Sequence, residues 1–164
     1  MSAGRRKHLV RVGERAPAFR LPDLEGAFTE LEDLLAGGPL LVVFFKITCP
    51  VCQMELPFLD RIHREARGAV SVLGISQDGE EWTRDFKQRF GVTFPALLDG
   101  AEDRYPASNA WGISVVPAAF LVERDGAVSW MLEGFRKREI QALAGRFGVD
   151  PFQPGEYVPE AKAG

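Results

Sequence analysis

The sequence predicts an α/β domain with three layers, in which helices cover both faces of a central mixed β-sheet. A continuously apolar run, "LLVVFF" (40–45), is typical of a strand that is buried on both faces. Strand-like segments then alternate with amphipathic helical segments through the middle of the chain. With 164 residues, of which 46% are hydrophobic, the chain is expected to form one domain, 13–150. Residues 1–12 and 151–164 are predicted to be N-terminal and C-terminal tails.

The first half of the chain predicts two extended segments and two helices. "APAFRLPDLEG" (16–26) indicates a short extended segment closed by a turn, and Thr29–Leu35 a helical turn or two that Gly37-Gly38-Pro39 ends. The buried strand 40–45 follows, and then a helix from about Pro50 to Arg67.

The next part predicts a strand, "AVSVLGIS" (69–76), and a helix from Glu80 to Phe90. Trp82, Phe86 and Phe90 fall four residues apart in this helix, so we expect them to form one stripe that faces the core. "TFPALLD" then indicates a short extended piece and "NAWGI" a helical turn.

The last part predicts two strands and a closing helix. The stretch "SVVPAAFLVERDGAVSWMLEG" contains Asp125-Gly126 between two apolar runs, which is a strong hairpin signal. An amphipathic helix is expected over Lys137–Phe147. Because a hairpin joins antiparallel strands whereas the earlier strands are separated by helices, the sheet is predicted to be mixed.

Charge and hydropathy argue against two classes of partner. The net charge of −3 gives no field that attracts nucleic acid or anionic membranes, so we expect neither partner. No apolar run approaches the roughly 20 residues of a membrane-spanning helix. The stretch "MSAGRRKHLVRVGERAP" has basic residues without an apolar segment after them, so no signal peptide is predicted and a cytoplasmic location is expected.

The only two cysteines, Cys49 and Cys52, lie where the apolar strand gives way to a helix. Pro50 suits the first helical turn because its missing N–H would be unpaired there anyway. Cys49 is therefore expected at the helix N-terminus, where free N–H groups and the helix dipole favour a thiolate. Cys52 is one turn further on and within bridging distance. This spacing predicts a redox pair in which Cys49 attacks and Cys52 resolves the mixed disulfide.

Two other interpretations of the cysteine pair remain open from the residues alone. A metal site within one chain needs about four ligands, but only two histidines accompany the cysteines. His63 is roughly 16 Å from Cys52 along the same predicted helix, and His8 lies in a predicted tail. We therefore predict no metal site and no bound cofactor, while a metal shared between two chains, or two inert buried thiols, stays an alternative.

Several segments together resemble a known fold. "VGERAPAFRLPDLEG", "CPVCQMELP", "VLGISQD", "FPALLD" and "WGISVVPAAFLVERDG" occur in the order and spacing of the thioredoxin-like fold. They most resemble its TlpA-like and ResA-like thiol-disulfide oxidoreductases, in the AhpC/TSA (redoxin) group, over residues 12–149. The resemblance implies a three-layer thioredoxin-like α/β/α fold and a disulfide reductase acting through Cys49-Pro50-Val51-Cys52. It implies a disulfide-containing protein or a small-molecule disulfide as substrate, and an upstream thiol reductant.

The resemblance also implies a role for Glu55, which matches the glutamate of the CxxCxxExP pattern. In the family this glutamate lies beneath the active site and takes part in proton handling, so Glu55 is expected to accept a proton from Cys52. Spacing alone favours the alternative, a surface helix carboxylate without a role in the chemistry. Pro57 matches the proline of the same pattern, inside the predicted helix.

The same resemblance assigns the substrate-binding surface. Val116-Pro117 matches a loop with a cis-proline, which in the family lies beside the cysteines and hydrogen-bonds an extended substrate. Thr48 stands where the family commonly has Trp, and Pro50 lies between the cysteines, so both are expected at this surface. Trp111 is a candidate for an aromatic wall, with core packing as its alternative.

Two further functions are weighed against the reductase. A peroxiredoxin-like peroxidase usually has the motif P-x-x-x-T/S-x-x-C. Counting back from Cys49 places Lys46 and Val42 at the Thr and Pro positions, and counting back from Cys52 places Cys49 and Phe45 there. Neither register fits. The other alternative is a non-catalytic thioredoxin-fold binding module or metal carrier.

Overall fold

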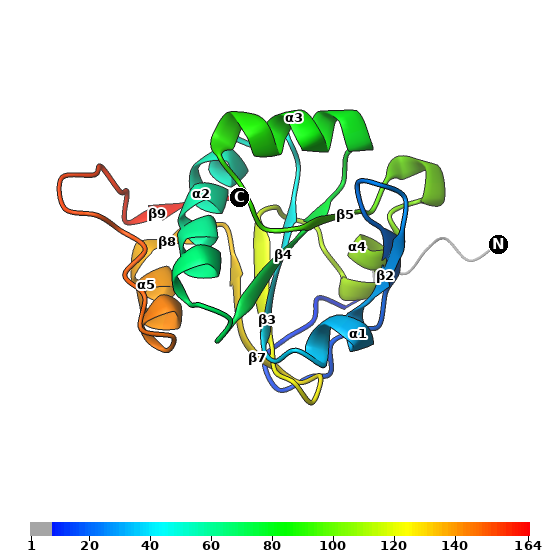
Figure 1. Cartoon of the computed structure of the whole chain (residues 1–164), viewed down its shortest axis with the longest axis horizontal. Coiled ribbons are helices and arrows are strands. Elements are labelled where there is room, and N and C mark those ends of the chain that lie inside the picture. Colours follow the sequence, from blue (N-terminus) through cyan, green and yellow to red (C-terminus); the bar gives the residue numbers. More distant parts are fainter. Residues whose placement is uncertain (1–7) are drawn as a thin grey trace.

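A computed structural model of the chain describes residues 8–164 (Figure 1). Its helices and strands follow the predicted order, and the additional strand pairs are short. The strands are β1 Arg20–Pro22, β2 Phe28–Glu30, β3 Leu40–Phe45, β4 Ser71–Ser76, β5 Ala96–Leu98, β6 Ala118–Val122, β7 Val128–Glu133, β8 Phe135–Arg136 and β9 Ala161–Lys162. The helices are α1 Leu31–Leu35, α2 Pro50–Glu65, α3 Glu80–Phe90, α4 Pro106–Trp111 and α5 Lys137–Gly145, with a 3₁₀ turn η1 at Ala101–Asp103.

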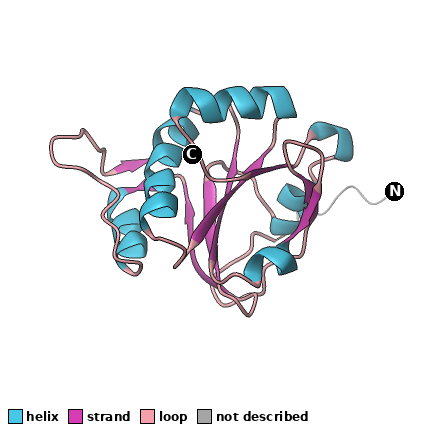
Figure 2. Cartoon of the chain, in the orientation of Figure 1, coloured by secondary structure: helices cyan, strands magenta, loops and turns pink. Residues whose placement is uncertain are grey.

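The central sheet has the strand order β5-β4-β3-β6-β7 (Figure 1). β3 pairs in parallel with β4, and β4 in parallel with β5, whereas β3–β6 and β6–β7 are antiparallel. All six residues of the middle strand, β3, are buried, as the apolar run predicted. The sheet is therefore mixed, with helices on both sides of it (Figure 2).

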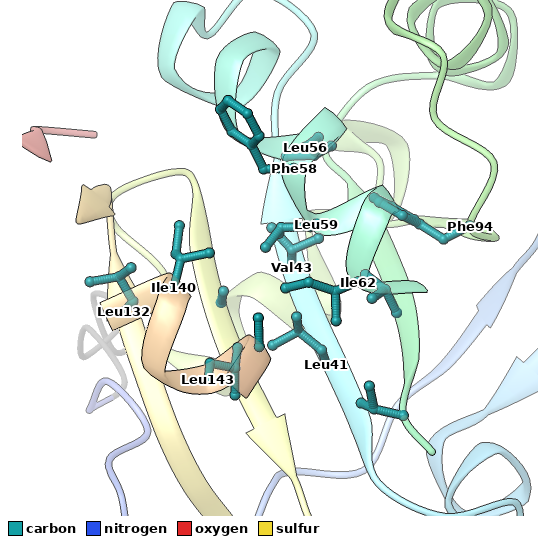
Figure 3. Packing of buried hydrophobic residues seen from close by; sticks show 14 of the residues in the cluster. Leu41, Val43, Leu56, Phe58, Leu59, Ile62, Phe94, Leu132, Ile140 and Leu143 are labelled. Carbon is teal, nitrogen blue, oxygen red and sulfur yellow. The ribbon is translucent and has the colours of Figure 1, made fainter. Parts of the chain in front are cut away.

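Two hydrophobic cores lie on the two faces of this sheet because successive β3 side chains point in opposite directions. On one face Leu41 and Val43 pack with Leu59 of α2 and with residues of α5 (Figure 3). Phe86 of α3 belongs to the same core. On the other face Phe44 packs with α1 and α4, and its ring centroid is 5.3 Å from that of Trp111. The three-layer arrangement follows directly from this alternation, and it confirms the predicted fold class.

The helix α3 buries a different face from the predicted one. Phe86 is buried and Phe90 half-buried, but the Trp82 side chain is 62% exposed, so the expected stripe of three aromatics is wrong at its first position. Thr83 is buried instead, where its hydroxyl lies 2.6 Å from that of Ser76. A neighbouring strand thus fixes the rotation of the helix, which helical periodicity alone did not reveal.

Both predicted tails pack against the domain where they are described. Residues 1–7 lie outside the described part, but the buried Val10 donates its N–H to the carbonyl of Trp111 at 3.1 Å. Near the other end, β9 pairs with β8. Glu156 forms an ion pair with Arg61 of α2, with N–O distances of 2.5 and 2.8 Å. The ion pair and the pairing of β9 with β8 therefore hold the segment 151–164 against the domain.

The last described residue lies close to a loop that leads into β6. A β-carbon added to Gly164 would lie 2.6 Å from the carbonyl oxygen of Val116 and 2.5 Å from the side chain of Val115. The chain at Gly164 is thus packed directly on these two residues. Among residues 8–164 no helix is long and apolar enough to cross a membrane.

Candidate active site

The loop after β3 is held in place by hydrogen bonds from two directions. The N–H of Ile47 donates to Oδ2 of Asp78 at 2.8 Å, and Nε2 of Gln53 donates to the carbonyl of Ile47 at 2.9 Å. Asp78 can reach this loop because β3 and β4 are parallel neighbours, with Phe45 opposite Ser76, so both strands end at the same edge of the sheet. The loop therefore delivers Cys49 to a fixed position at that edge.

Cys49 is the N-cap residue of α2, and Pro50 is the first helical residue, as predicted. The backbone N–H of Cys52 donates to Sγ of Cys49 at 3.2 Å. The Cys49 thiol in turn lies 3.6 Å from the carbonyl oxygen of Val116 and donates to it. An N–H at the positive end of a helix favours negative charge on the atom it faces. Cys49 is also partly exposed, so an incoming disulfide can reach its sulfur.

Cys52 has the opposite environment. Its side chain is fully buried, and both cysteines are free thiols. Burial raises the pKa of the Cys52 thiol, and the hydrogen bond with Cys49 and the charge of Glu55 raise it further. Burial therefore disfavours the thiolate form of Cys52. Of the two cysteines only Cys49 is partly exposed.

Glu55 lies one helical turn beyond Cys52, and its side chain is also fully buried. Neither carboxyl oxygen has a hydrogen-bond partner among residues 8–164. Burial raises the pKa of the Glu55 carboxyl well above its ordinary value of 4.5, because an unpaired charge is poorly solvated in the interior. The surface alternative for Glu55 is thus wrong: this is a buried proton-binding group near the cysteine pair.

The loop that leads into β6 lies directly beside the cysteines. The Val116-Pro117 peptide bond is cis, as the resemblance implied, and the Val116 carbonyl accepts the Cys49 hydrogen bond. Pro117 is buried, whereas Val116 is half-exposed. Thr48 and Pro50, the residues before and after Cys49, are exposed.

Trp111 is not part of this surface. Its side chain is fully buried, on the face of the sheet covered by α1 and α4. Its ring packs between Phe44 and Phe120, and its Nε1 donates to the carbonyl of Pro17 at 3.1 Å. The expectation that Trp111 forms an aromatic wall beside the cysteines is therefore wrong, and the alternative, that Trp111 packs in the core, is correct. Burial decides this, since no surface remains for a substrate to contact.

The histidines are engaged elsewhere in the described part of the chain. Nδ1 of His63 accepts the N–H of Val72 at 3.0 Å, and Nε2 of His8 lies 2.9 Å from a carboxyl oxygen of Glu14. Within residues 8–164 no three His, Cys, Asp or Glu side chains are grouped in a way that could hold a metal ion.

Sequence reasoning missed a polar network at the same edge of the sheet. The buried Asp99 accepts hydrogen bonds from the N–H groups of Ala107 and Ser108 and from the Ser108 hydroxyl, at 2.8, 2.7 and 2.5 Å. Nε2 of Gln77 donates to that hydroxyl at 2.9 Å. Gln77 and Asp99 directly follow β4 and β5, so the rule that parallel strands end at one edge could have brought them to attention.

These features define a thioredoxin-like domain with a partly exposed cysteine, a buried cysteine and a cis-proline loop gathered at one edge of its sheet. The model of the AhpC/TSA family matches residues 12–131. This match covers well over half of the chain, and the chain belongs to the AhpC/TSA family.

Two relatives of the chain are named thiol-disulfide oxidoreductases, which is the class that the sequence resemblance implied. The chain is 30% identical to the thiol-disulfide oxidoreductase ResA of Geobacillus thermodenitrificans, over 81% of this chain and 75% of that protein. It is 31% identical to the ResA of Halalkalibacterium halodurans, over 74% of this chain and 68% of that protein.

Solved structures support the fold. The thioredoxin domain of a thiol-disulfide oxidoreductase from Bacteroides vulgatus matches with a TM-score of 0.73 and 23% identity, over 84% of this chain and 98% of that one. A thiol:disulfide interchange protein from a Bacteroides species matches with a TM-score of 0.71 and 23% identity, over 84% and 88% of the two chains. At these identities the likeness concerns the fold.

Proposed function

We propose that this protein is a thiol–disulfide oxidoreductase that reduces disulfides through Cys49 and Cys52. One observation carries the proposal: a partly exposed cysteine sulfur receives an N–H from a helix N-terminus, while the second cysteine is buried one turn away. This difference in access gives the two thiols separate roles. The names of the ResA relatives support the same class of reaction.

In the first step the Cys49 thiolate attacks one sulfur of the substrate disulfide. A new S–S bond joins Cys49 to that sulfur, the substrate S–S bond breaks, and the departing thiolate takes a proton from solvent. The Val116 carbonyl, 3.6 Å from Sγ of Cys49, lies beside the position of the incoming sulfur. An extended substrate would pair with the backbone of this loop, next to Thr48 and Pro50.

In the second step Cys52 attacks Sγ of Cys49 and releases the other half of the substrate as a thiolate. Cys52 must lose its proton first, and burial opposes this loss. We assign Glu55 as the group that accepts this proton, since it is buried one turn away and no other partner occupies its oxygens among the described residues. The products are a reduced substrate and a Cys49–Cys52 disulfide, so two electrons have been transferred.

The cycle requires two kinds of partner. A disulfide-containing protein or small-molecule disulfide accepts the electrons, and an upstream thiol reductant returns the Cys49–Cys52 disulfide to two thiols. The proposal needs no bound cofactor because all the redox chemistry occurs at sulfur. The cytoplasmic location expected from the first residues remains a proposal, which cell fractionation would test.

Trapping of the intermediate tests the proposal. In Cys52→Ser the second step is blocked, so we expect a covalent mixed disulfide between Cys49 and the substrate, detectable by mass spectrometry and removed by dithiothreitol. The control Cys49→Ser should form none, because the buried Cys52 is inaccessible. Equal trapping by both variants, or by neither, would contradict the assigned roles.

The direction of electron flow is tested by the reduction potential of the Cys49–Cys52 couple. A value near that of thioredoxin, about −270 mV, is expected for a reductase, whereas a value near about −120 mV would indicate an oxidant. Rapid oxidation of Cys49 by hydrogen peroxide that persists in Cys52→Ser would instead favour a peroxidase. Stoichiometric metal in protein purified without oxygen would favour a metal carrier.

A further inference from the structure

A polar cleft of about 220 Å³ opens next to the cysteine site. The two sites share Val116, whose carbonyl receives the hydrogen bond of Cys49. The lining comes from the loop after β3, the residue after β4, α4 with the residue before it, and the loop before β6. The residues are Lys46, Gln77, Tyr105, Ser108, Asn109, Ile113, Ser114 and Val116.

The residues that line this cleft carry a positive charge and no negative charge. Of its eight residues Lys46 is the only charged one, and none is acidic. Lys46 is exposed and forms no ion pair with any residue of 8–164. The Ser108 hydroxyl and one N–H each of Gln77 and Asn109 are donated inside the protein. The hydroxyls of Tyr105 and Ser114 can donate hydrogen bonds to a ligand. The cleft is thus suited to an anionic group.

The buried acid that is hydrogen-bonded to this lining, Asp99, does not cancel the charge of Lys46. Asp99 lies behind Ser108, and its two oxygens accept three hydrogen bonds from Ala107 and Ser108. Its negative charge is therefore met by donors inside the protein. The same network fixes the cleft wall, because the Ser108 hydroxyl also accepts a hydrogen bond from Nε2 of Gln77.

Lys46 has a fixed relation to the nucleophile. Its backbone carbonyl accepts the N–H of Cys49 at 3.3 Å, and Lys46 lines the cleft together with Val116. A substrate whose sulfur lies at Cys49 therefore places its adjoining atoms within reach of the cleft. One cation at this position adds attraction only for substrates that carry a negative group near the disulfide.

We propose that this cleft is a substrate subsite that binds a carboxylate next to the disulfide to be reduced, with Lys46 as its cation. The inference rests on the proposed function. It adds that the substrate carries a negative charge next to its disulfide. The carboxylate belongs either to a small disulfide or to an acidic side chain beside a substrate cysteine in a protein.

Kinetics with matched disulfides test this proposal. The probes are 3,3′-dithiodipropionate, which carries two carboxylates, and bis(2-hydroxyethyl) disulfide, which is neutral and of similar size. The carboxylate preference is the kcat/KM for the first divided by that for the second. In Lys46→Gln we expect this preference to fall about threefold to tenfold, mainly through KM, as for one charge-assisted contact at a partly exposed site.

Two control variants define the effect. Lys46→Arg keeps the charge and should retain most of the preference, whereas Lys137→Gln removes a charge outside the cleft and should keep the wild-type value. Added salt should lower the preference of the wild type, because the Debye length is about 10 Å at 0.1 M. An equal preference in wild type and Lys46→Gln would overturn the proposal.

Peptide disulfides that differ only in Asp or Asn beside the cysteine identify the source of the carboxylate. If Lys46→Gln changes the Asp-to-Asn ratio more than the ratio for the small disulfides, the substrate is a protein. The reverse result assigns a small disulfide. No change in either ratio counts against the subsite.

A binding measurement separates this proposal from the proposed function. In the double variant Cys49→Ser, Cys52→Ser, titration with 3,3′-dithiodipropionate should shift the backbone amide NMR signals of Gln77, Ser108 and Ser114, and the neutral disulfide should not. These shifts without any turnover by the wild type would retain the subsite and reject the reductase. Turnover of both disulfides without such shifts would retain the reductase and reject the subsite.

Discussion

Three side chains within two turns of α2 differ in access to solvent, and their burial determines what each can do. Cys49 is partly exposed, whereas Cys52 and Glu55 are fully buried. Burial raises the pKa of both the Cys52 thiol and the Glu55 carboxyl, so both hold their protons more tightly than in water. Transfer of the Cys52 proton to an ionised Glu55 replaces one buried charge by another, so the second step adds no second buried charge.

Glu55→Gln should raise stability and lower activity. The folded-state pKa of Glu55 is above its unfolded value of 4.5, so the folded state binds more protons in the interval between them. Stability then falls as pH rises through that interval, by about 1.4 kcal/mol per pH unit. Glutamine removes this penalty, so the difference in unfolding free energy from wild type should grow with pH above 4.5, as measured by urea denaturation.

The same variant should slow the second chemical step. In single-turnover experiments the mixed disulfide should accumulate, because Cys52 has lost its proton acceptor. Glu65→Gln is the matched control, since Glu65 is exposed at the far end of the same helix. A Glu55→Gln protein with wild-type resolution kinetics and wild-type pH dependence of stability would contradict both assignments.

At the scale of helices and strands, the features that depend on neighbouring residues were predictable from the sequence, and the contacts between distant segments were not. Strand β3, the start of α2 at Pro50 and the hairpin at Asp125-Gly126 each depend on neighbouring residues, and all three were predictable. The exposure of Trp82 and the pairing of β9 with β8 depend on contacts between distant segments. Periodicity and composition carry no information about such contacts.

The ion pair between α2 and the C-terminal segment should be sensitive to acid. Arg61 lowers the pKa of Glu156 from 4.5 to about 2. Its contribution to stability is therefore present above pH 4.5 and is lost as pH falls from 4.5 towards 2. Glu156→Gln should melt a few degrees below wild type at pH 7, and the difference should disappear near pH 2. Differential scanning calorimetry at both pH values would measure this.

A nearby glutamate provides the comparison for this experiment. Glu160 lies in the same segment, is exposed and forms no ion pair within residues 8–164. Glu160→Gln should therefore melt close to wild type at both pH values. A similar loss in both variants would mean that the charge of the segment, rather than the Arg61 contact, is responsible.

At the scale of the whole molecule, the central sheet separates two hydrophobic cores. The candidate active site lies where β3 and β4 end. The cysteine pair was predictable because its residues are adjacent in sequence and its motif is specific. The polar cleft was not, because its residues come from four separate segments that only the pairing of β3 with both β4 and β6 and the packing of α4 bring together. Trp111 was ambiguous for the same reason, since only the fold shows which face it occupies.

Leu59→Ala should destabilise the entire domain. Leu59 is fully buried between α2 and the sheet, so truncation leaves a cavity and costs about 2–5 kcal/mol. Circular dichroism and tryptophan fluorescence should report the same shifted denaturation midpoint, because different probes give coincident transitions when a single domain unfolds cooperatively. The control Trp82→Ala removes a larger but exposed side chain and should change stability by less than about 0.5 kcal/mol.

The contact of Gly164 with Val115 and Val116 has a practical consequence for work on this protein. Any label or fused segment placed at Gly164 starts next to the loop that faces Cys49. Enzymatic assays therefore call for protein without such an addition. Conversely, an environment-sensitive dye attached there is well placed to report the arrival of a substrate.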